Sequence, residues 1–253
     1  MAYNEFAYFY DEFNSAADYD ALFRYVQGEL AAHGVAGGIL ADLGCGTGDR
    51  TLMLTQAGYD VIGIDRSEEM LSVLREKADE LGLGGRLLLL RQDLLELDLY
   101  GTIRAAVSTF DTFSHIGPLE RFEQAIRKAA YFMEKGGVFL FDLNTPYKYE
   151  HILAGQTFDI EAEDATCRWT NLYEAEKARV RITIDIDYLD TGEHFQETFY
   201  EYSYPLQTVL TLLERYGFRA ARLADGEDFG PVRADSPRWI ITAVKQYTQE
   251  DKE

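Results

Sequence analysis

Residues that could crosslink the chain or bind a structural metal are scarce in this sequence. Its 253 residues include only two cysteines, Cys45 and Cys167, and four histidines. The cysteines lie far apart and form no Cys-x-x-Cys pair, which argues against a zinc site and against a disulfide framework. A chain of this length buries enough surface to fold without either one. We therefore expect a protein of the reducing cytoplasm that holds no metal.

Long apolar stretches are missing as well. The longest candidates, Leu87–Leu90 and Val138–Phe141, are far shorter than the roughly 18 residues that indicate a membrane-spanning helix. The opening segment, MAYNEFAYFYDEF, carries three acidic side chains and no basic one, unlike a secretory signal peptide. The sequence therefore predicts neither a membrane span nor a signal peptide.

Positive charge is in short supply. The chain has 24 Lys and Arg residues against 44 Asp and Glu residues, a formal net charge of −20. Binding to a nucleic-acid backbone depends on Lys and Arg that neutralise phosphates. The composition therefore disfavours nucleic acid as a partner without excluding it, and it leaves the oligomeric state open. Most of the excess acidity we attribute to solubility.

What the sequence does contain is a regular alternation of short apolar runs and amphipathic segments. The runs predict strands at Gly38–Leu43, Tyr59–Ile64, Arg86–Leu90, Arg104–Ser108, Val138–Asp142, Phe218–Leu223 and Trp239–Val244. Amphipathic segments between them predict helices, one of them capped by Ser67. This alternation predicts an α/β fold: a seven-stranded, mostly parallel Rossmann-like sheet with helices on both faces.

The alternation is interrupted by a stretch with a different pattern. Apolar and polar residues alternate along Arg179–Tyr188, a turn signal follows, and Glu193–Tyr204 reads as the returning strand. We predict residues 151–203 as a small antiparallel insert after strand 5 that covers the substrate. Residues 1–150 and 204–253 would form the core, with a lid and helix in residues 1–35. The acidic face of the insert suits either an amine-bearing acceptor or simple solvation, and solvation is the commoner use.

A glycine-rich loop follows the first predicted strand, in the sequence LADLGCGTG at residues 40–48. Glycines let the backbone turn tightly and approach a ligand closely. The dinucleotide fingerprint is GxGxxG, whereas Gly44, Gly46 and Gly48 form GxGxG with Asp49 behind them. Asp42 and Asp49 would also repel a pyrophosphate. The loop therefore favours a ligand without phosphate and with a cationic sulfur over a nicotinamide dinucleotide.

An acid stands at the end of the second predicted strand. Asp65 comes 17 residues after Gly48. In α/β nucleotide-binding folds, an acid at this place accepts the ribose hydroxyls. The loop and the acid together predict a bound nucleoside.

These segments, with VIGIDRSEEML, RQDLLEL, AAVSTFDTFSHI and GGVFLFDLNTPY, resemble the class I S-adenosylmethionine-dependent methyltransferases. The resemblance covers roughly residues 6–245. The opening FAYFYDEFNSAADYDALFRYV is similar to that of a small bacterial subgroup akin to the sugar N-methyltransferases. The resemblance implies S-adenosyl-L-methionine as cofactor and S-adenosyl-L-homocysteine as product.

The resemblance also implies a set of cofactor contacts. The methionine end would meet Asp42, Gly44, Cys45, Gly46 and Gly48; the ribose and adenine would meet Asp65, Arg66, Gln92, Asp93 and Leu94; the sulfonium would meet Thr109 and Phe110, under a lid containing Tyr10 and Tyr19. Arg66 stands where related proteins often have an apolar residue, and its guanidinium suits stacking on a purine.

The catalytic residues are less sharply indicated. Methyl transfer needs a general base when the acceptor arrives protonated. His115, after the fourth predicted strand, is the candidate base, with Asp111 beside it; capping of the next helix or exposure to solvent would explain His115 equally well. Three further polar residues near strand 5 are predicted to face the substrate: Asp142, Asn144 and Tyr147.

We interpret the chain as a methyltransferase that transfers a methyl group to N or O of a small molecule by in-line displacement. Three alternatives remain. The first is a protein that binds the cofactor without catalysis, and the second is an RNA or protein methyltransferase. The third is an NAD-dependent oxidoreductase, which the GxGxG spacing disfavours.

Overall fold

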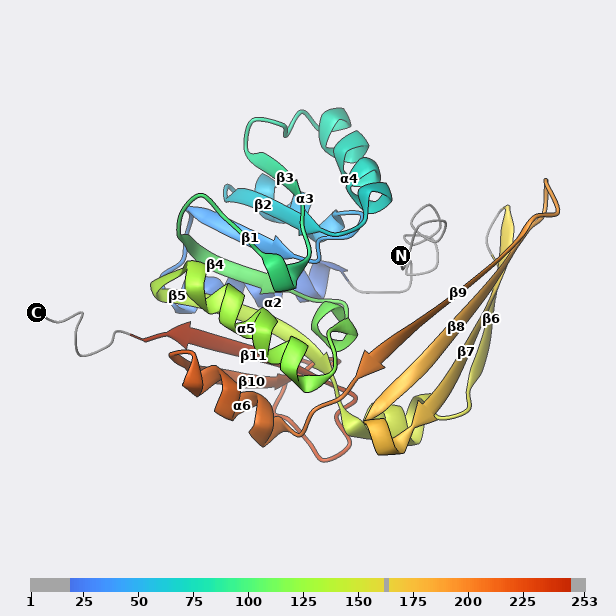
Figure 1. Cartoon of the computed structure of the whole chain (residues 1–253). Helices are drawn as coiled ribbons and strands as arrows, with labels where there is room; N and C mark the ends of the chain where they lie inside the picture. The colour runs from blue at the N-terminus through green and yellow to red at the C-terminus, as the bar shows by residue number, and fades with distance from the viewer. Residues whose placement is uncertain (1–18, 162–163, 247–253) are drawn as a thin grey trace, which may run out of the picture.

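The fold centres on one seven-stranded sheet, described here from a computed structural model that covers residues 19–161 and 164–246 (Figure 1). The strand order is β10-β11-β5-β4-β1-β2-β3. Strand β1 pairs in parallel with β2 and β4, whereas β11 runs antiparallel to both β5 and β10. The strands are β1 Ile39–Leu43, β2 Asp60–Asp65, β3 Leu87–Arg91, β4 Ile103–Ser108, β5 Met133–Asn144, β10 Phe218–Asp225 and β11 Arg238–Lys245. The predicted sheet is confirmed.

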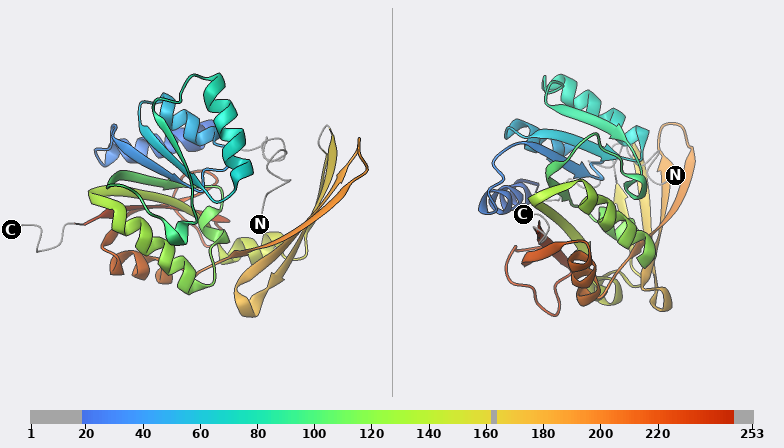
Figure 2. Two further views of the ribbon diagram at one scale, coloured as in Figure 1. Left: turned by 45° about the horizontal axis from the view of Figure 1, so that its top comes forward. Right: turned by 60° about the vertical axis from the view of Figure 1, so that its left-hand side comes forward.

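Helices cover both faces of this sheet (Figure 2). One apolar core contains side chains of α5 and α6, among them Phe122 and Val209. A second core on the other face contains side chains of α2 and α3, among them Val26 and Leu54. Burial on both faces explains why the central strands read as continuous apolar runs. The helices are α2 Tyr19–Ala32, α3 Asp49–Gln56, α4 Glu68–Glu80, α5 Leu119–Phe132 and α6 Leu206–Arg215.

Ser67 begins α4 as predicted. Its side-chain oxygen accepts a hydrogen bond from the Met70 N–H at 3.2 Å, which satisfies one of the free donors of the first turn. Glu68 and Glu69 lie in that same turn, where the helix dipole favours negative charge. The cap starts α4 two residues after Asp65, which ends β2 at the carboxyl edge of the sheet.

A second sheet projects from the core on the side toward which the carboxyl ends of β1 and β4 point (Figure 1). Its four antiparallel strands lie in the order β6-β7-β8-β9. The predicted hairpin is confirmed as β8 and β9, and the alternating Val180, Ile182, Ile184 and Ile186 are all buried. The strands are β6 Thr157–Glu161, β7 Ala165–Glu174, β8 Arg179–Tyr188 and β9 His194–Tyr202. This sheet is called the insert below.

Strands β6 and β7 were not predicted, because β7 breaks the expected polarity. Asn171 is buried on the inner face of the insert, whereas the next residue, Leu172, is exposed on the outer face. This reversal hides the strand from an analysis based on alternation.

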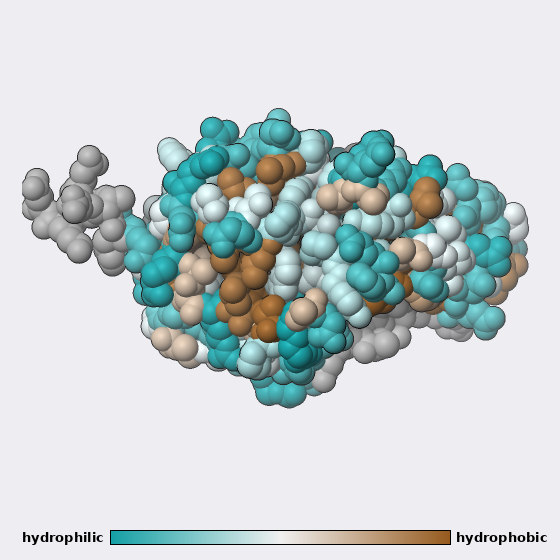
Figure 3. Space-filling view, turned by 90° about the horizontal axis from the view of Figure 1, so that it is seen from below, coloured by the Kyte–Doolittle hydropathy of each residue, from teal (hydrophilic) through white to brown (hydrophobic). Residues whose placement is uncertain are grey.

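The outer surface is largely hydrophilic. Seen from below, hydrophilic residues cover most of the molecule, and apolar residues gather mainly on the underside of the core (Figure 3). Within the described ranges, no helix is both long enough and apolar enough to cross a membrane.

Candidate active site

A cleft lies at the carboxyl edge of the sheet, where β1 pairs with both β2 and β4. This reversal of strand order is the usual ligand site of open α/β sheets. The cleft is partly open to solvent. Several predicted residues meet in its wall: Gly44, Asp65, Arg66, Gln92, Asp93, Leu94 and His115.

A second cavity adjoins the cleft and shares Gly44 and Thr112 with it. The glycine loop and the start of α3 form one side of this cavity. Its wall includes the predicted residues Tyr19, Cys45, Gly46, Gly48, Thr109 and Phe110. The two adjoining cavities, which extend from the glycine loop to the end of β3, are together called the binding groove below. Tyr10 lies outside the described residues.

Gly44 lets the glycine loop pack closely against the segment after β4. Its φ is +72°, and a Cβ atom at this position would overlap the Thr112 side chain. A Cβ at Gly46 would meet nothing within 4 Å. The first glycine is therefore required by the protein's own packing, whereas the space beside the second is open.

Asp65 links the end of β2 to the glycine loop. Its two carboxylate oxygens accept hydrogen bonds from the Gly46 N–H at 3.0 Å and the Ser67 N–H at 2.9 Å. Burial raises the pKa of Asp65, and these two hydrogen bonds partly offset that effect. Each carboxylate oxygen has a second lone pair. Asp65 therefore retains acceptors for ribose hydroxyls.

Asp93 occupies the far end of the groove. It begins the short 3-10 turn η2 (Leu94–Glu96), and its Oδ1 accepts a hydrogen bond from the Leu95 N–H at 2.9 Å. The neighbouring Gln92 side chain bonds both backbone groups of Asp98. The predicted adenine-binding residues are therefore fixed by local hydrogen bonds.

Asp42 differs from its predicted role. Its carboxylate is fully buried and lines neither cavity; it forms an ion pair with Arg50 and accepts a hydrogen bond from the Thr51 hydroxyl at 2.6 Å. Arg50 instead reaches the cavity beside the glycine loop. Asp42 therefore contributes to that cavity indirectly, through its ion pair with Arg50.

Arg50 was not predicted from the sequence. Its side chain is 6% exposed, and its Nε and Nη1 atoms have no hydrogen-bond partner among the described residues. Leaving buried donors unpaired is costly. A carboxylate bound beside the glycine loop would give Arg50 a further acceptor. The signal in the sequence was a cation in the first turn of the helix, opposite the acid of β1.

Aromatic side chains close the glycine-loop end of the groove. The rings of Tyr19 and Phe110 lie 4.9 Å apart, in a tilted arrangement. Beside them, the Thr109 hydroxyl is buried without a hydrogen-bond partner in the described ranges. The structure thus brings these three residues together, as the sequence predicted. An aromatic face near a cationic sulfur is electrostatically favourable.

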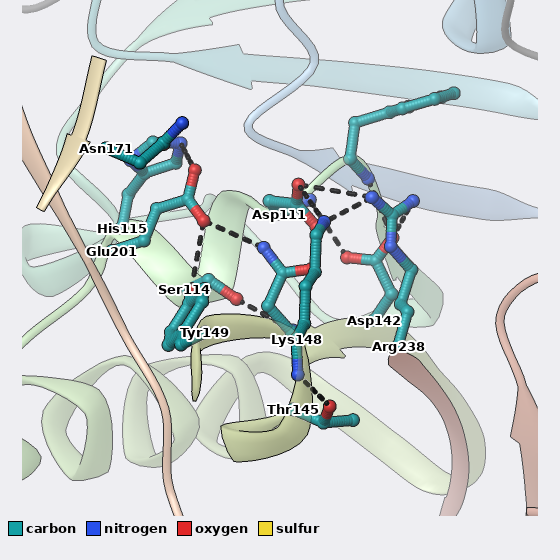
Figure 4. A network of polar contacts seen from close by, with 12 residues as sticks. Asp111, Ser114, His115, Asp142, Thr145, Lys148, Tyr149, Asn171, Glu201 and Arg238 are labelled. Atoms are coloured by element: carbon teal, nitrogen blue, oxygen red, sulfur yellow. Dashed lines mark hydrogen bonds and ion pairs between the residues drawn. The ribbon is translucent and has the colours of Figure 1, made fainter. Parts of the chain in front are cut away.

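The buried Asp142 forms a group with two partly buried residues, Asp111 and Arg238. Asp142 accepts hydrogen bonds from the Phe110 and Asp111 N–H groups at 2.9 and 3.0 Å. The Arg238 guanidinium lies 3.0 Å from an Asp111 oxygen and 3.5 Å from an Asp142 oxygen (Figure 4). Neither carboxylate is part of the wall of the binding groove. Asp142 holds the loop after β4, and Asp111 pairs with a cation.

The shared cation separates the two carboxyl groups electrostatically. Burial opposes the ionisation of Asp111, but Arg238 and then Lys148 outweigh it and lower the pKa of Asp111 to about 2. Burial raises the pKa of Asp142 to about 6, against the attraction of Arg238. The site therefore depends on Arg238 for its charge balance.

His115 lies on the turn η3 (Thr112–His115) and lines the cleft. Its Nε2 atom is 3.8 Å from Glu201 Oε1, and its ring is 5.3 Å from that of Phe199. Both neighbours belong to β9 of the insert. The insert therefore meets the core at the predicted base. No local pattern, either in the loop after β4 or in β9, indicates this contact.

Two of the residues predicted to contact the substrate, Asn144 and Tyr147, contact other protein side chains instead. Asn144 is buried and donates to Glu201 Oε2 at 2.8 Å, while its own oxygen accepts from Lys148 Nζ at 2.8 Å. Tyr147 stacks on His151 with a ring separation of 4.6 Å. Neither residue lines the binding groove. Four charged site residues were missed in the sequence: Arg50, Lys148, Glu201 and Arg238.

Comparison with known proteins supplies relatives over the whole chain. Residues 40–137 match a family model described as a methyltransferase domain. The putative methyltransferase YqeM of Bacillus subtilis is 28% identical over 98% of this chain and 99% of its own length. A putative methyltransferase of Geobacillus, GWCH70_2453, is 29% identical over 67% of this chain and 68% of its own length.

Solved structures share the fold. An S-adenosylmethionine-dependent methyltransferase from Clostridium acetobutylicum matches with a TM-score of 0.86 at 23% identity, over 98% of this chain and 100% of that one. The sugar N-methyltransferase KedS8 from Streptoalloteichus matches with a TM-score of 0.76 at 19% identity, over 94% and 93%. At these identities the likeness concerns the fold, including both the core and the insert.

Proposed function

This chain is a class I S-adenosylmethionine-dependent methyltransferase, and from that premise we propose that it methylates a nitrogen or oxygen atom of a small molecule. The observation that carries the proposal is the arrangement of charge along the binding groove. The buried cation Arg50, whose Nε and Nη1 atoms have no hydrogen-bond partner among the described residues, lies at one end, and the carboxylates of Asp65 and Asp93 lie toward the other.

The groove fits S-adenosylmethionine group by group. Arg50 suits the carboxylate of the methionine part, because its unpaired donors are buried beside the glycine loop. Asp65 suits the ribose hydroxyls and Asp93 the adenine amino group, because carboxylate oxygens accept such hydrogen bonds. A pyrophosphate would lie near acids in the same groove. The fit therefore favours this cofactor over a dinucleotide.

The cofactor supplies a methyl group on a positively charged sulfur, which keeps the bonding electrons when the methyl leaves. The protein's part is to hold the acceptor in line with that bond and to accept its proton. His115 is the proposed base, because it lines the cleft and faces the insert. The insert covers the acceptor in this proposal.

Loss of Asp65 should weaken cofactor binding selectively. We expect Asp65→Ala to reduce the affinity for S-adenosylhomocysteine about 10- to 100-fold, because hydrogen bonds to a charged group contribute about 1.5–3 kcal/mol. Asp93→Ala should act in the same direction. Isothermal titration calorimetry measures both effects.

The control for these variants is Asp60→Ala. Asp60 lies at the opposite end of β2, is 62% exposed and pairs with Arg86 at 3.3 Å. This variant should bind S-adenosylhomocysteine like the unmodified protein. Unchanged affinity in both Asp65→Ala and Asp93→Ala, with the fold intact by circular dichroism, would show that the cofactor binds elsewhere.

The acceptor class is tested with cofactor that carries an isotopically labelled methyl group. Small amines, small alcohols, RNA and unfolded protein are offered in parallel. We expect label only in products of the small molecules. Label in RNA or protein would contradict the proposal. Tight cofactor binding with no product from any acceptor would instead support a non-catalytic binding protein.

A further inference from the structure

The insert carries a buried carboxylate into the active site. Glu201, near the end of β9, is only 5% exposed. Its Oε2 atom accepts hydrogen bonds from Asn144 Nδ2 at 2.8 Å and from the Tyr149 hydroxyl at 3.0 Å. Its other oxygen, Oε1, is the one 3.8 Å from His115 Nε2 (Figure 4). Residues from the end of β5 and from the π-helical turn η4 (Lys148–Leu153) thus fix the carboxylate against His115.

The ion pairs of Arg238 and Lys148 are with other carboxylates. Arg238 lies between Asp111 and Asp142, and Lys148 is 3.8 Å from Asp111. Among the described residues, the hydrogen-bond donors to the Glu201 carboxylate are neutral groups, and its ion-pair partner is His115. A buried carboxylate without a positive partner is costly. A proton on His115 supplies that partner.

We propose that Glu201 is a positioning residue for His115: it holds the ring at the cleft and stabilises the protonated ring that forms when the acceptor's proton is transferred. The catalytic base is then completed by the insert rather than by the core alone. This inference rests on the proposed function, according to which the proton comes from the methyl acceptor. The acceptor X–H bond breaks, its proton goes to a His115 ring nitrogen, and its electron pair forms the new bond to the methyl carbon.

Other charged groups also surround His115. Asp111 lies on the same loop, Lys148 and Arg238 act through Asp111, Arg121 of α5 lines the cleft, and Asp65 and Asp93 line its other side. All of these remain when Glu201 is replaced by glutamine. A comparison of Glu201→Gln with the unmodified chain therefore isolates the carboxylate.

The test needs no acceptor. The full chain is labelled with ¹³C in its four histidine rings, the His115 signal is assigned with His115→Asn, and the ring signals are followed from pH 5 to pH 9. In Glu201→Gln, the pH at which the His115 signal has moved halfway should fall by about one, because an opposite charge within about 4–6 Å favours the protonated form. An unchanged midpoint would overturn the inference.

The chain offers a matched control in the same sheet. Asp187 Oδ1 lies 2.8 Å from Nδ1 of His194, far from the cleft on the exposed face of the insert. Asp187→Asn should leave the His115 signal where it was. If Glu201→Gln does not fold, Glu201→Asp keeps the charge in a shorter side chain. Glu201→Asp is then compared with a double variant that combines Asp187→Asn with Glu201→Ala and so lacks both carboxylates. The midpoint pH of the His115 signal should be higher in Glu201→Asp than in the double variant, and equal midpoints would overturn the inference.

Calorimetry separates this inference from the proposed function. Glu201 does not line the binding groove, so Glu201→Gln should bind S-adenosylhomocysteine normally. If the unmodified chain does not bind S-adenosylhomocysteine, the proposed function is contradicted, but the histidine titration can still be interpreted. Normal binding with an unmoved His115 signal would remove the inference alone.

Discussion

Arg50→Lys is expected to weaken S-adenosylhomocysteine binding at least about 10-fold and to leave 5′-methylthioadenosine binding unchanged. The first ligand carries the amino-acid carboxylate, and the second lacks it. Lysine keeps a positive charge beside the buried Asp42 but removes the planar group whose Nε and Nη1 have no hydrogen-bond partner among the described residues. Charge-assisted hydrogen bonds are about twice as strong as neutral ones, so the loss is large. Calorimetry with both ligands measures it.

This pair of ligands also distinguishes loss of the carboxylate contact from a general distortion of the site. Distortion of the glycine loop in Arg50→Lys would weaken both ligands, whereas loss of the carboxylate contact weakens one. Equal affinity of the variant and the unmodified chain for S-adenosylhomocysteine would contradict the assignment of Arg50. The methionine end of the cofactor would then have to lie elsewhere in the groove.

Arg238→Met should lower the free energy of unfolding by about 3–5 kcal/mol, the usual cost of leaving a buried charge without its partner. The substitution removes the guanidinium between Asp111 and Asp142, which are both largely buried. Lys148, at 3.8 Å from Asp111, replaces little of that attraction. Urea denaturation followed by circular dichroism gives the change.

The loss in Arg238→Met should also depend on pH. Without the guanidinium, the folded-state pKa of Asp142, already above the value of about 3.9 in an unfolded chain, rises further, and the pKa of Asp111 rises from its lowered value. The folded state then keeps protons that the unfolded state releases, so stability falls as pH rises through that window. The variant should therefore lose less at pH 5 than at pH 7.5.

Arg168→Met is the matched control for Arg238→Met. Arg168 pairs with Asp159 at 2.8 Å, but both side chains are about two-thirds exposed. Exposed ion pairs contribute little, so this variant should unfold like the unmodified chain at both pH values. A small, pH-independent effect of Arg238→Met would show that the two carboxyl groups are not held by this arginine.

The sheet and one wall of the site could be predicted because their signals are local. Strands buried on both faces appear as apolar runs, and the carboxyl ends of parallel strands meet at one edge. Asp65, Asp93 and Thr109 follow separate strands in the chain, yet all face the predicted groove. A segment such as LADLGCGTG specifies its own turn and the start of its own helix.

The rest of the site depends on contacts that no local pattern records. Asn144 meets Glu201 across 57 residues of chain, and Asp111 meets Arg238 across 127. Asp142 and Asn144 lie at the end of a strand, as ligand-binding residues do, but they are buried among their partners. Whether a polar side chain at a strand end faces the ligand or supports its neighbours is decided by those distant partners.

One titration tests the central claim most directly: calorimetry of the purified full chain with S-adenosylhomocysteine, with NADH alongside. The arrangement of Arg50, Asp65 and Asp93 predicts saturable one-to-one binding of S-adenosylhomocysteine and none of NADH. Binding of NADH alone would contradict the account, because the groove would then hold a pyrophosphate beside its acidic residues.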